Sequence, residues 1–474
     1  MRNKYKYLFK NIGLLTISRF GTNVLSFFLV PLYTSILSTA EYGKYDLVNT
    51  TVSLLIPVLT INISVAVFRF SIDGKNQWKD VFSVGLRYLG IGTSIVIALL
   101  IINRVFGFVE IFSDYGLYMV LMFVSSAFYE TISNFSRGLE KIKEFAIAGI
   151  ISIVTLIVFN ILFLVIVKIG LEGYFLAHIL ANLIPLLYLA FVIRFRKYIC
   201  LHPDRSTENE MKQYSIPMIA NAVGWWINNA SDRYVVTMIS GIAATGVYSV
   251  AYKIPTILST FQNIFNQAWV LSAVKDFDKN DDSGFFTTIY NTYNFACVAV
   301  CSLLIMFCQV IARILFAKDF YDTWEYVPFL LMSVVFGAMS GYFGCIFSAV
   351  KKPKIFGQST MIGAVINLIL NFILVYIIGP LGAAIATAFS YFVVWSIRYY
   401  QTRKYINMNI NLKRDCITYG CLLLQSIAML LVMNKLILYV VQVVLFGTIL
   451  FLSRPEIKYL MEKGRGILAG LRSR

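Results

Sequence analysis

The stretch 145–167 reads FAIAGIISIVTLIVFNILFLVIV and contains no charged residue. A helix needs about 20 mainly apolar residues to cross the hydrocarbon layer of a membrane, so this stretch alone predicts a transmembrane helix. The whole chain has the same character, with 58% hydrophobic and 14% charged residues in 474 and a mean hydropathy of +0.74. A soluble chain usually carries about 25% charged residues. This composition excludes a soluble enzyme, a disordered chain and a secreted disulfide scaffold.

Hydrophobic windows predict fourteen such spans, which makes the chain an all-α polytopic membrane protein. The predicted spans are 11–37, 42–68, 81–102, 117–135, 145–167, 173–195, 213–239, 245–274, 285–315, 326–350, 356–378, 381–400, 416–433 and 436–452. The first apolar stretch is too long for a cleavable signal and contains Arg19, so no signal peptide is expected.

The positively charged residues of the chain are concentrated in alternate loops between the predicted spans. There are 41 Lys and Arg residues against 24 Asp and Glu residues, a net charge of +17. Most of these cations fall in one set of alternate loops, and few fall in the opposite set. The positive-inside rule therefore predicts that both termini are cytoplasmic, which requires an even number of spans and agrees with fourteen. Because topology accounts for the charge, no nucleic acid partner is expected.

The sequence contains an internal repeat, in which residues 137–174 correspond to 348–383 at an offset of 211. Matched pairs are Asn160 with Asn371, Gly173 with Gly382 after a two-residue gap, and Gly43 with Gly246 near the start of each half. The repeat predicts two pseudo-symmetric six-helix bundles, 1–200 and 201–405, followed by two helices and a basic tail in 406–474. Repeat-built transporters bind cargo where the repeats meet, which predicts a central cavity. Coincidence between apolar sequences is the alternative.

Four predicted spans carry polar residues along one helical face, although lipid contact makes such residues costly. The stripes include Arg19 and Asn23 in the first span, Asp46 and Asn49 in the second, Asn221, Asn228 and Asp232 in the seventh, and Lys253 and Asn263 in the eighth. These spans are equivalent in the repeat, so we expect their polar faces to line the cavity. Hydrogen bonding between packed helices, worth about 0.6 kcal/mol per contact, explains single residues equally well.

Charged residues inside the spans narrow the candidate site. The cations are Arg19, Arg87, Arg233 and Lys253, and the acids are Asp46, Glu130 and Asp232. Each cation costs about 2.5–3.5 kcal/mol at the bilayer centre, so it must be paired, wetted or close to a span end. We expect Arg19 and Lys253 to bind an anion, and Arg87 either to line the cavity or to anchor at the interface. Phosphate or diphosphate suits these side chains, because arginine offers bidentate donors and lysine a compact charge.

The acids allow other roles. Asp232 and Arg233 lie near the predicted outer end of their span and suit an interfacial or pairing role. Glu130 shares a helical face with Arg137, so it either pairs with a neighbouring cation, which we favour, or carries a coupling proton. The pattern identifies no coupling ion, and both H+ and Na+ stay open.

The sequence lacks the motifs of several other chemistries. The seven cysteines form no CxxC pair, His178 and His202 lack the spacing of a zinc site, and there is no GxxxxGK[ST] motif. We therefore expect no catalytic residue, no metal site and no cofactor.

Several short motifs carry a family resemblance. They are Arg19-Phe-Gly, Pro31-Leu-Tyr, Ala40-Glu-Tyr-Gly43-Lys-Tyr, Ser136-Arg-Gly138, Asp232-Arg-Tyr234 and Gly379-Pro-Leu-Gly382-Ala-Ala. Over residues 5–405 the chain resembles the Wzx-type polysaccharide flippases of the multidrug/oligosaccharidyl-lipid/polysaccharide (MOP) exporter superfamily. The resemblance implies two six-helix bundles forming a V around a cationic cavity. It also implies that Arg19 and Lys253 occupy basic family positions, with lysine where arginine is commoner at the second.

The resemblance implies a transporter rather than an enzyme. Family members move undecaprenyl-diphosphate-linked oligosaccharides from the inner to the outer leaflet of the bacterial cytoplasmic membrane, for O-antigen, other lipopolysaccharide, capsule or exopolysaccharide. Implied partners are the lipid-linked oligosaccharide, the bilayer, a polysaccharide polymerase and chain-length or export proteins. Two other classes stay open. A multidrug cation antiporter of the same superfamily needs an acid in its cavity, and a membrane-embedded polymerase or ligase needs a sizeable outer loop.

Overall fold

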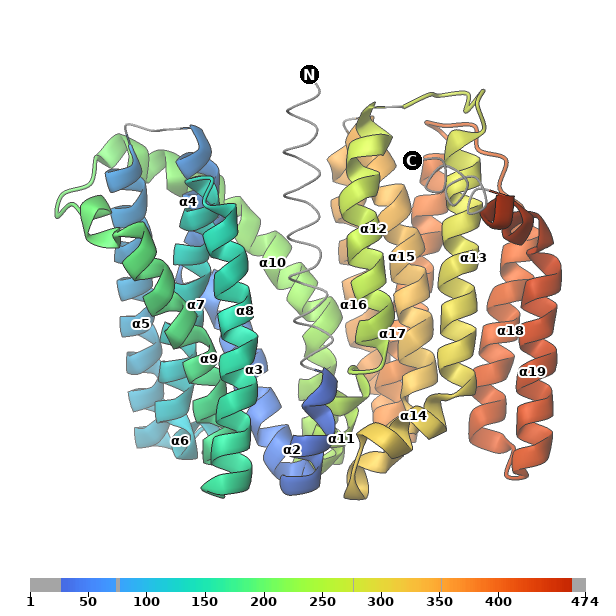
Figure 1. Cartoon of the computed structure of the whole chain (residues 1–474), viewed down its shortest axis with the longest axis horizontal. Helices are drawn as coiled ribbons and strands as arrows, with labels where there is room; N and C mark the ends of the chain where they lie inside the picture. The colour runs from blue at the N-terminus through green and yellow to red at the C-terminus, as the bar shows by residue number, and fades with distance from the viewer. Residues whose placement is uncertain (1–26, 74–76, 276, 351, 463–474) are drawn as a thin grey trace, which may run out of the picture. The chain divides into compact units, whose positions relative to one another are not determined.

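The computed structural model describes residues 27–73, 77–275, 277–350 and 352–462, and nearly all of them are helical (Figure 1). No β-strand occurs in these ranges. Ten of the described helices are long and apolar enough to cross a membrane, and one bent helix pair brings the number to eleven. The chain is therefore an all-α multi-pass membrane protein, as its composition predicts.

The described residues divide into two compact units. Unit 1 runs to Thr237 and includes Gly241–Gly246, whereas unit 2 comprises Met238–Ser240 and the residues from Val247 onward. The division falls near the end of the long helix α10 (Arg205–Ser240), so all of this helix except its last three residues belongs to unit 1. The predicted limits at residues 200 and 405 describe the sequence repeat and stay a prediction.

Unit 1 is arranged around α7. Its elements are α2 (Val30–Ile36), α3 (Thr39–Leu59), α4 (Ile63–Asp73), α5 (Trp78–Phe106), α6 (Glu110–Asp114), α7 (Gly116–Gly138), α8 (Ile142–Asn160) with a π-helical continuation (Ile161–Ile166), α9 (Gly170–Ile193), a 3-10 turn (Phe195–Tyr198), α10, and the first half of α11 (Ile242–Ala251). Helix α7 packs against α3, α4, α5 and α9. The rings of Phe82 and Phe135, 4.6 Å apart between centroids, lie in its buried core. Close packing of this kind holds helices together in lipid.

Unit 2 repeats this arrangement around α15. Its elements are α12 (Pro255–Lys275), α13 (Phe285–Met306), α14 (Cys308–Leu315), a 3-10 helix (Lys318–Glu325), α15 (Val327–Ala349), α16 (Pro353–Ile378), α17 (Pro380–Thr402), α18 (Leu412–Leu431) and α19 (Lys435–Leu452). Helix α15 begins and ends 211 residues after α7 begins and ends, the offset found in the sequence. It packs against α12, α13 and α17, the repeat equivalents of the helices around α7.

The matched glycines occupy equivalent contacts in the two units. A Cβ on Gly173 of α9 would lie 2.7 Å from the Cβ of Phe163, and a Cβ on Gly382 of α17 would meet the backbone of Leu374. Residues 163 and 374 are again 211 apart, although the glycines are two residues closer. The two-residue gap therefore lies in the turn before each second helix. The matched Asn160 and Asn371 are both buried.

Three predicted spans are each interrupted rather than continuous. In the second, α3 and α4 meet at 56°, because Ile61 and Asn62 adopt left-handed conformations shortly after Pro57. The eighth is divided into α11 and α12, and α12 begins at Pro255, which cannot donate a helical hydrogen bond. The ninth ends at Met306, and its predicted continuation forms the separate short helix α14.

Three predicted spans are not among the apolar helices. The first lies mostly outside the described residues. The seventh and the second part of the eighth are helices α10 and α12, long enough to cross a membrane but too polar to pass as ordinary lipid-facing spans. These two helices carry predicted polar stripes, so their polarity needs a neighbour other than lipid.

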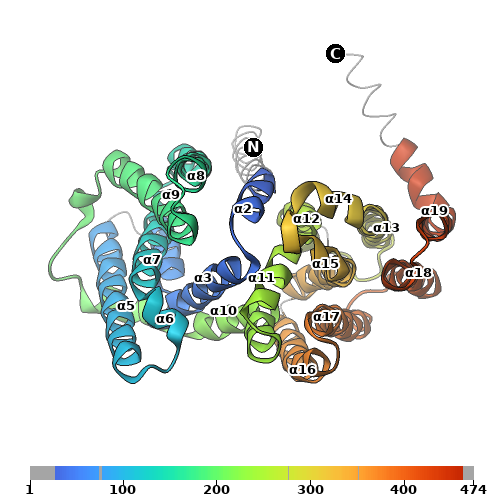
Figure 2. The same ribbon diagram turned by 90° about the horizontal axis from the view of Figure 1, so that it is seen from below.

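Helices α18 and α19, which have no counterpart in the repeat, lie side by side (Figure 2). Buried amides join them: Gln425 Nε2 donates to the Gln442 carbonyl at 3.3 Å, and Gln442 Nε2 donates to the Gln425 carbonyl at 3.0 Å. Ser302 of α13 donates to Gln425 Oε1 at 2.7 Å. Buried hydrogen bonds thus join α18 to α19 and attach these two helices to the rest of unit 2.

Candidate functional site

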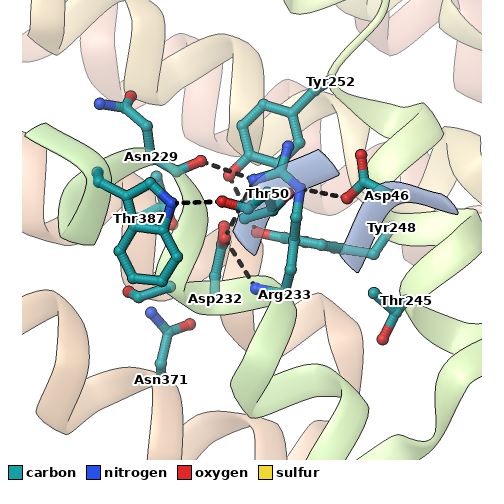
Figure 3. Close-up of polar contacts among 12 residues, drawn as sticks. Asp46, Thr50, Asn229, Asp232, Arg233, Thr245, Tyr248, Tyr252, Asn371 and Thr387 are labelled. Atoms are coloured by element: carbon teal, nitrogen blue, oxygen red, sulfur yellow. Dashed lines mark hydrogen bonds and ion pairs between the residues drawn. The ribbon is translucent and has the colours of Figure 1, made fainter. Parts of the chain in front are cut away.

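A charged cluster joins α3 to α10 in unit 1 (Figure 3). The Nε atom of Arg233 lies 2.7 Å from Asp46 Oδ2, and its Nη1 atom lies 3.5 Å from Asp232 Oδ1. Nη1 also donates to the carbonyl of Asn229 at 2.7 Å. The side chains of Arg233 and Asp46 are each 12% exposed, and that of Asp232 is 1% exposed. One cation is therefore shared by two shielded carboxylates, so this cluster carries no excess of positive charge.

Local sequence places Asp46 at this contact. Ser38 Oγ accepts from the Glu41 amide at 3.2 Å, and the Glu41 carboxylate accepts from the Ser38 amide at 2.8 Å, a capping box that begins α3. Asp46 then lies about two turns into the helix and is buried. One turn before it, Gly43 meets Gly246 of α11, where an added Cβ would lie 3.1 Å from the Gly246 amide nitrogen. Glycine at both positions permits this close approach.

Neutral hydrogen bonds extend the junction of α3 and α10. The hydroxyl oxygens of Thr51 and Tyr234 lie 2.5 Å apart, and Trp226 Nε1 donates to the Thr50 carbonyl at 3.0 Å. The rings of Trp226 and Tyr234 are 5.5 Å apart between centroids. These contacts fix the register in which the two helices present their remaining faces.

The outward side of this junction is polar and exposed. It carries Asn49 and Ser53 of α3, and Asn221, Trp225 and Asn229 of α10, all of them exposed. We call this set the amide–indole face. Amides and hydroxyls in contact with hydrocarbon are costly, so this face suits contact with water or a polar cargo. Asn49 and Asn221 of this face belong to the predicted polar stripes.

Arg87 lies away from this face and is engaged by an acid. Its Nη1 atom is 2.7 Å from Glu208 Oε2, and Tyr88 donates to the other carboxylate oxygen at 2.9 Å. Burial alone would raise the pKa of Glu208. Hydrogen bonds from Tyr88 and Lys212, with the charges of Lys212 and Arg87, outweigh burial and hold this pKa below its usual value. The arrangement resembles an anchor near the start of α10 more than a site for cargo.

Glu130 accepts a hydrogen bond from the hydroxyl of Ser64 at 2.7 Å. The expected cation partner is not found within the described residues. Arg137, on the same helix, lies instead over the rings of Phe68 and Phe145, 4.5 Å and 5.4 Å from their centroids. The guanidinium is thus drawn to aromatic faces rather than to the carboxylate.

In unit 2, Lys253 lies in the break between α11 and α12 rather than inside a helix, where its amide donates to the Val250 carbonyl at 2.9 Å. The Lys253 side chain is half-buried, and Asn263 is exposed on α12. The described residues contain no group of His, Cys, Asp or Glu side chains that could hold a metal ion.

The other predicted residues separate into three cases. Asn221 belongs to the amide–indole face. Asn228 is buried, and its Nδ2 donates to the Gly224 carbonyl of its own helix at 3.0 Å, so it does not line that face. Arg19 and Asn23 lie outside the described residues.

Sequence reasoning gave no role to Arg398, which lies near the end of the predicted span 381–400. The residue lies in α17, is 4% exposed, and donates to Ser359 Oγ at 2.9 Å, the Ser340 carbonyl at 2.9 Å and Thr360 Oγ1 at 2.8 Å. The ring of Phe356 lies 4.1 Å from the guanidinium. The partners of Arg398 are neutral residues of two other helices, α15 and α16. No local motif around Arg398 indicates this contact.

Solved structures share this fold. A lipid II flippase, MurJ, in an inward closed conformation matches 94% of this chain and 99% of its own, at a TM-score of 0.70 and 16% identity. A multidrug resistance MATE family transporter of the MOP superfamily, in an inward-facing conformation, matches 82% of this chain and 97% of its own, at a TM-score of 0.65 and 14% identity. The fold is that of the membrane transporters of the MOP superfamily.

The sequence itself assigns the chain to a family. The polysaccharide biosynthesis protein family matches residues 8–270, more than half of the chain, and the chain belongs to this family. The sequence match thus identifies the family, and the fold is the one that this chain shares with the solved transporters.

Two archaeal proteins are similar over part of the chain. The probable low-salt glycan biosynthesis flippase Agl15 of Haloferax volcanii is 22% identical over 192 residues, 40% of this chain and 41% of that protein. The uncharacterized membrane protein MJ1068 of Methanocaldococcus jannaschii is 22% identical over 295 residues, 58% of this chain and 57% of that protein. The chain thus spans about half the length of these relatives.

Proposed function

We propose that this protein translocates an undecaprenyl-diphosphate-linked oligosaccharide from the cytoplasmic to the outer leaflet of a bacterial cytoplasmic membrane. The observation that carries the proposal is the amide–indole face, a polar surface on helices of membrane-spanning length in a member of a polysaccharide biosynthesis family. The relative from Haloferax volcanii, described as a probable glycan biosynthesis flippase, supports the same role.

A polar surface at membrane depth addresses the physical problem of moving a glycan across lipid. Sugar hydroxyls and a diphosphate cannot enter hydrocarbon without losing their hydrogen bonds to water. Exposed amides replace those bonds while the lipid tail stays in the bilayer. Repeat-built transporters expose such a surface alternately to each side. An inside-negative potential adds about 2.3 kcal/mol per charge per 100 mV toward outward movement of the diphosphate.

Within this proposal, Arg19, Asn23 and Lys253 bind the diphosphate, and both termini face the cytoplasm. The exported unit serves O-antigen, capsule or exopolysaccharide synthesis, and a polymerase with chain-length or export proteins uses it outside. Arg87 is left out of the binding set because Glu208 already engages it.

A multidrug cation antiporter is the second candidate, because unit 1 contains the two shielded carboxylates Asp46 and Asp232. Such a transporter needs an acid open to a cationic drug. Here Arg233 occupies the space between the two acids, and the exposed residues beside them are neutral. This arrangement favours the flippase.

The test is extraction of lipid-linked intermediates from a deletion strain, with the glycan identified by mass spectrometry. The proposal expects lipid-linked oligosaccharide to accumulate on the cytoplasmic leaflet. The wild-type gene should clear it, and Arg19→Ala should not, at equal protein level and membrane insertion. Sensitivity to cationic drugs with normal surface glycan would instead support the antiporter. Normal export by Arg19→Ala would contradict the role given to that residue.

A further inference from the structure

Two adjacent tryptophans in the middle of α10 have opposite surroundings. Trp226 donates to the Thr50 carbonyl and packs on the Tyr234 ring, as a structural residue does. The side chain of Trp225 is 48% exposed, and among the described residues its ring has no stacking partner and its indole N–H no acceptor. As far as the described part of the chain goes, the Trp225 indole is therefore open to a ligand.

The position of Trp225 separates it from the tryptophans that anchor proteins at membrane surfaces. Helix α10 rises about 1.5 Å per residue, so Trp225 lies about 30 Å from its first residue and about 22 Å from its last. Anchoring tryptophans lie at the ends of spans, where indoles meet the headgroups. Trp225 lies well inside the helix and needs another explanation.

Its neighbours are polar and uncharged. Asn221 lies one turn before Trp225 and Asn229 one turn after it, and both are exposed. The hydrogen bond from Trp226 to Thr50 brings Asn49 and Ser53 of α3 to the same junction. The charge in this region is held by the cluster in which Arg233 faces Asp46 and Asp232. A ligand at Trp225 thus meets a flat aromatic ring among neutral hydrogen-bonding groups.

We propose that Trp225 stacks against a pyranose ring of the lipid-linked oligosaccharide, with Asn221 and Asn49 bonded to its hydroxyls. This inference rests on the proposed function, and it assigns the sugar portion of the cargo to the amide–indole face. A pyranose has an apolar C–H face and a rim of hydroxyls. An exposed ring face attracts the C–H groups, and amides both donate to and accept from hydroxyls. A diphosphate would require cations, so this surface selects the sugar.

Binding to the purified full-length protein tests the assignment with two probes. The first is the lipid-linked oligosaccharide extracted from the deletion strain, and the second is undecaprenyl diphosphate without sugar. Trp225→Ala should weaken binding of the first probe about three- to tenfold and leave binding of the second unchanged. Trp225→Tyr should restore most of the lost affinity, because it keeps a flat ring.

Trp226→Phe is the matched control. It removes the hydrogen bond to Thr50 and should lower the unfolding temperature without making the loss selective for the sugar-bearing probe. Unchanged binding of both probes to Trp225→Ala would overturn the stacking site, as would an equal loss for both. A wild-type protein that binds neither probe would contradict the proposed function and the stacking site together.

Discussion

Gly43 and Gly246 contact each other reciprocally. A Cβ on Gly43 would meet the carbonyl oxygen of Ile242 and lie 3.1 Å from the Gly246 amide nitrogen. A Cβ on Gly246 would meet the carbonyl oxygen of Thr39 and lie 3.1 Å from the Gly43 amide nitrogen. Thr39 and Ile242 are 203 residues apart in sequence, as are Gly43 and Gly246, so the two halves of this contact within unit 1 match each other.

Substitution of either glycine should destabilise the protein to a similar extent. Gly43→Ala and Gly246→Ala each place a methyl group against backbone that cannot move aside without separating α3 from α11. Overpacking of this kind costs about 1–3 kcal/mol. The unfolding temperature of each variant, followed by fluorescence in detergent, measures the loss.

Gly90→Ala provides the control, because nothing lies within 4 Å of an added Cβ at this position of α5. Alanine there should leave the unfolding temperature unchanged or raise it slightly, since glycine is the poorer helix former. If Gly43→Ala behaved like Gly90→Ala, the close contact would not exist in the folded protein.

The pair Asp46 and Arg233 should be energetically coupled. Asp46→Asn leaves Arg233 with Asp232 alone, and Arg233→Gln leaves two shielded carboxylates without their shared cation. A double-mutant cycle on the unfolding free energy should give a coupling of about 0.5–3 kcal/mol. Export should fall in both single variants, because the junction that presents the amide–indole face is loosened.

Asp114→Asn, at the exposed end of α6, should change neither stability nor export, because no ion pair involves Asp114 within the described residues. Strict additivity of Asp46→Asn and Arg233→Gln would show that the two side chains do not interact.

Glu208 should make stability depend on pH. Its pKa is lowered in the folded protein, so the ionised carboxylate is stabilised by folding. This contribution is complete above the usual glutamate pKa of about 4.3 and is lost as the pH falls through the folded pKa. Because Arg87 is partly exposed, Glu208→Gln should cost no more than about 1 kcal/mol at pH 7.

The difference between wild type and Glu208→Gln should shrink in acid, as measured by unfolding temperature from pH 7 to pH 3. Glu210→Gln, two residues away on the exposed side of α10, should show no comparable difference at any pH. If the Glu208→Gln variant were as stable as wild type at pH 7, the ion pair of Arg87 and Glu208 would not contribute to stability.

Much of the architecture can be predicted from the sequence. The length of an apolar stretch is a local property, and the repeat recurs at a nearly constant offset. The composition of residues 145–167 alone predicts a transmembrane helix. The sequence offset of 211 also equals the distance between the first residues, and between the last residues, of α7 and α15. The breaks were harder to place. Pro255 indicates a weak point in the eighth span, but the left-handed Ile61 and Asn62 depend on packing that no local pattern encodes.

The site was only partly predictable for a similar reason. A helical face can be read from spacing, and this is how Asp46 and Asn221 were assigned to polar stripes. Spacing does not say which member turns inward, so Asn228, bonded within its own helix, was grouped with exposed Asn221. The partner of Arg87 was equally hidden, because Glu208 lies 121 residues away in sequence.

Arg398 illustrates what charge counting overlooks, and it supports the last prediction. The rule that assigns cations to cytoplasmic loops is statistical, whereas this guanidinium is buried among neutral acceptors of α15 and α16.

Arg398→Gln should cost at least about 2 kcal/mol, because several buried acceptors lose their donor. Arg398→Lys should recover only part, since an ammonium group cannot reproduce the planar set of donors. Arg403→Gln, an exposed arginine one turn beyond, should have little effect on the unfolding temperature. Full stability of Arg398→Lys would mean that positive charge alone, and not the fork of hydrogen bonds, holds these helices together.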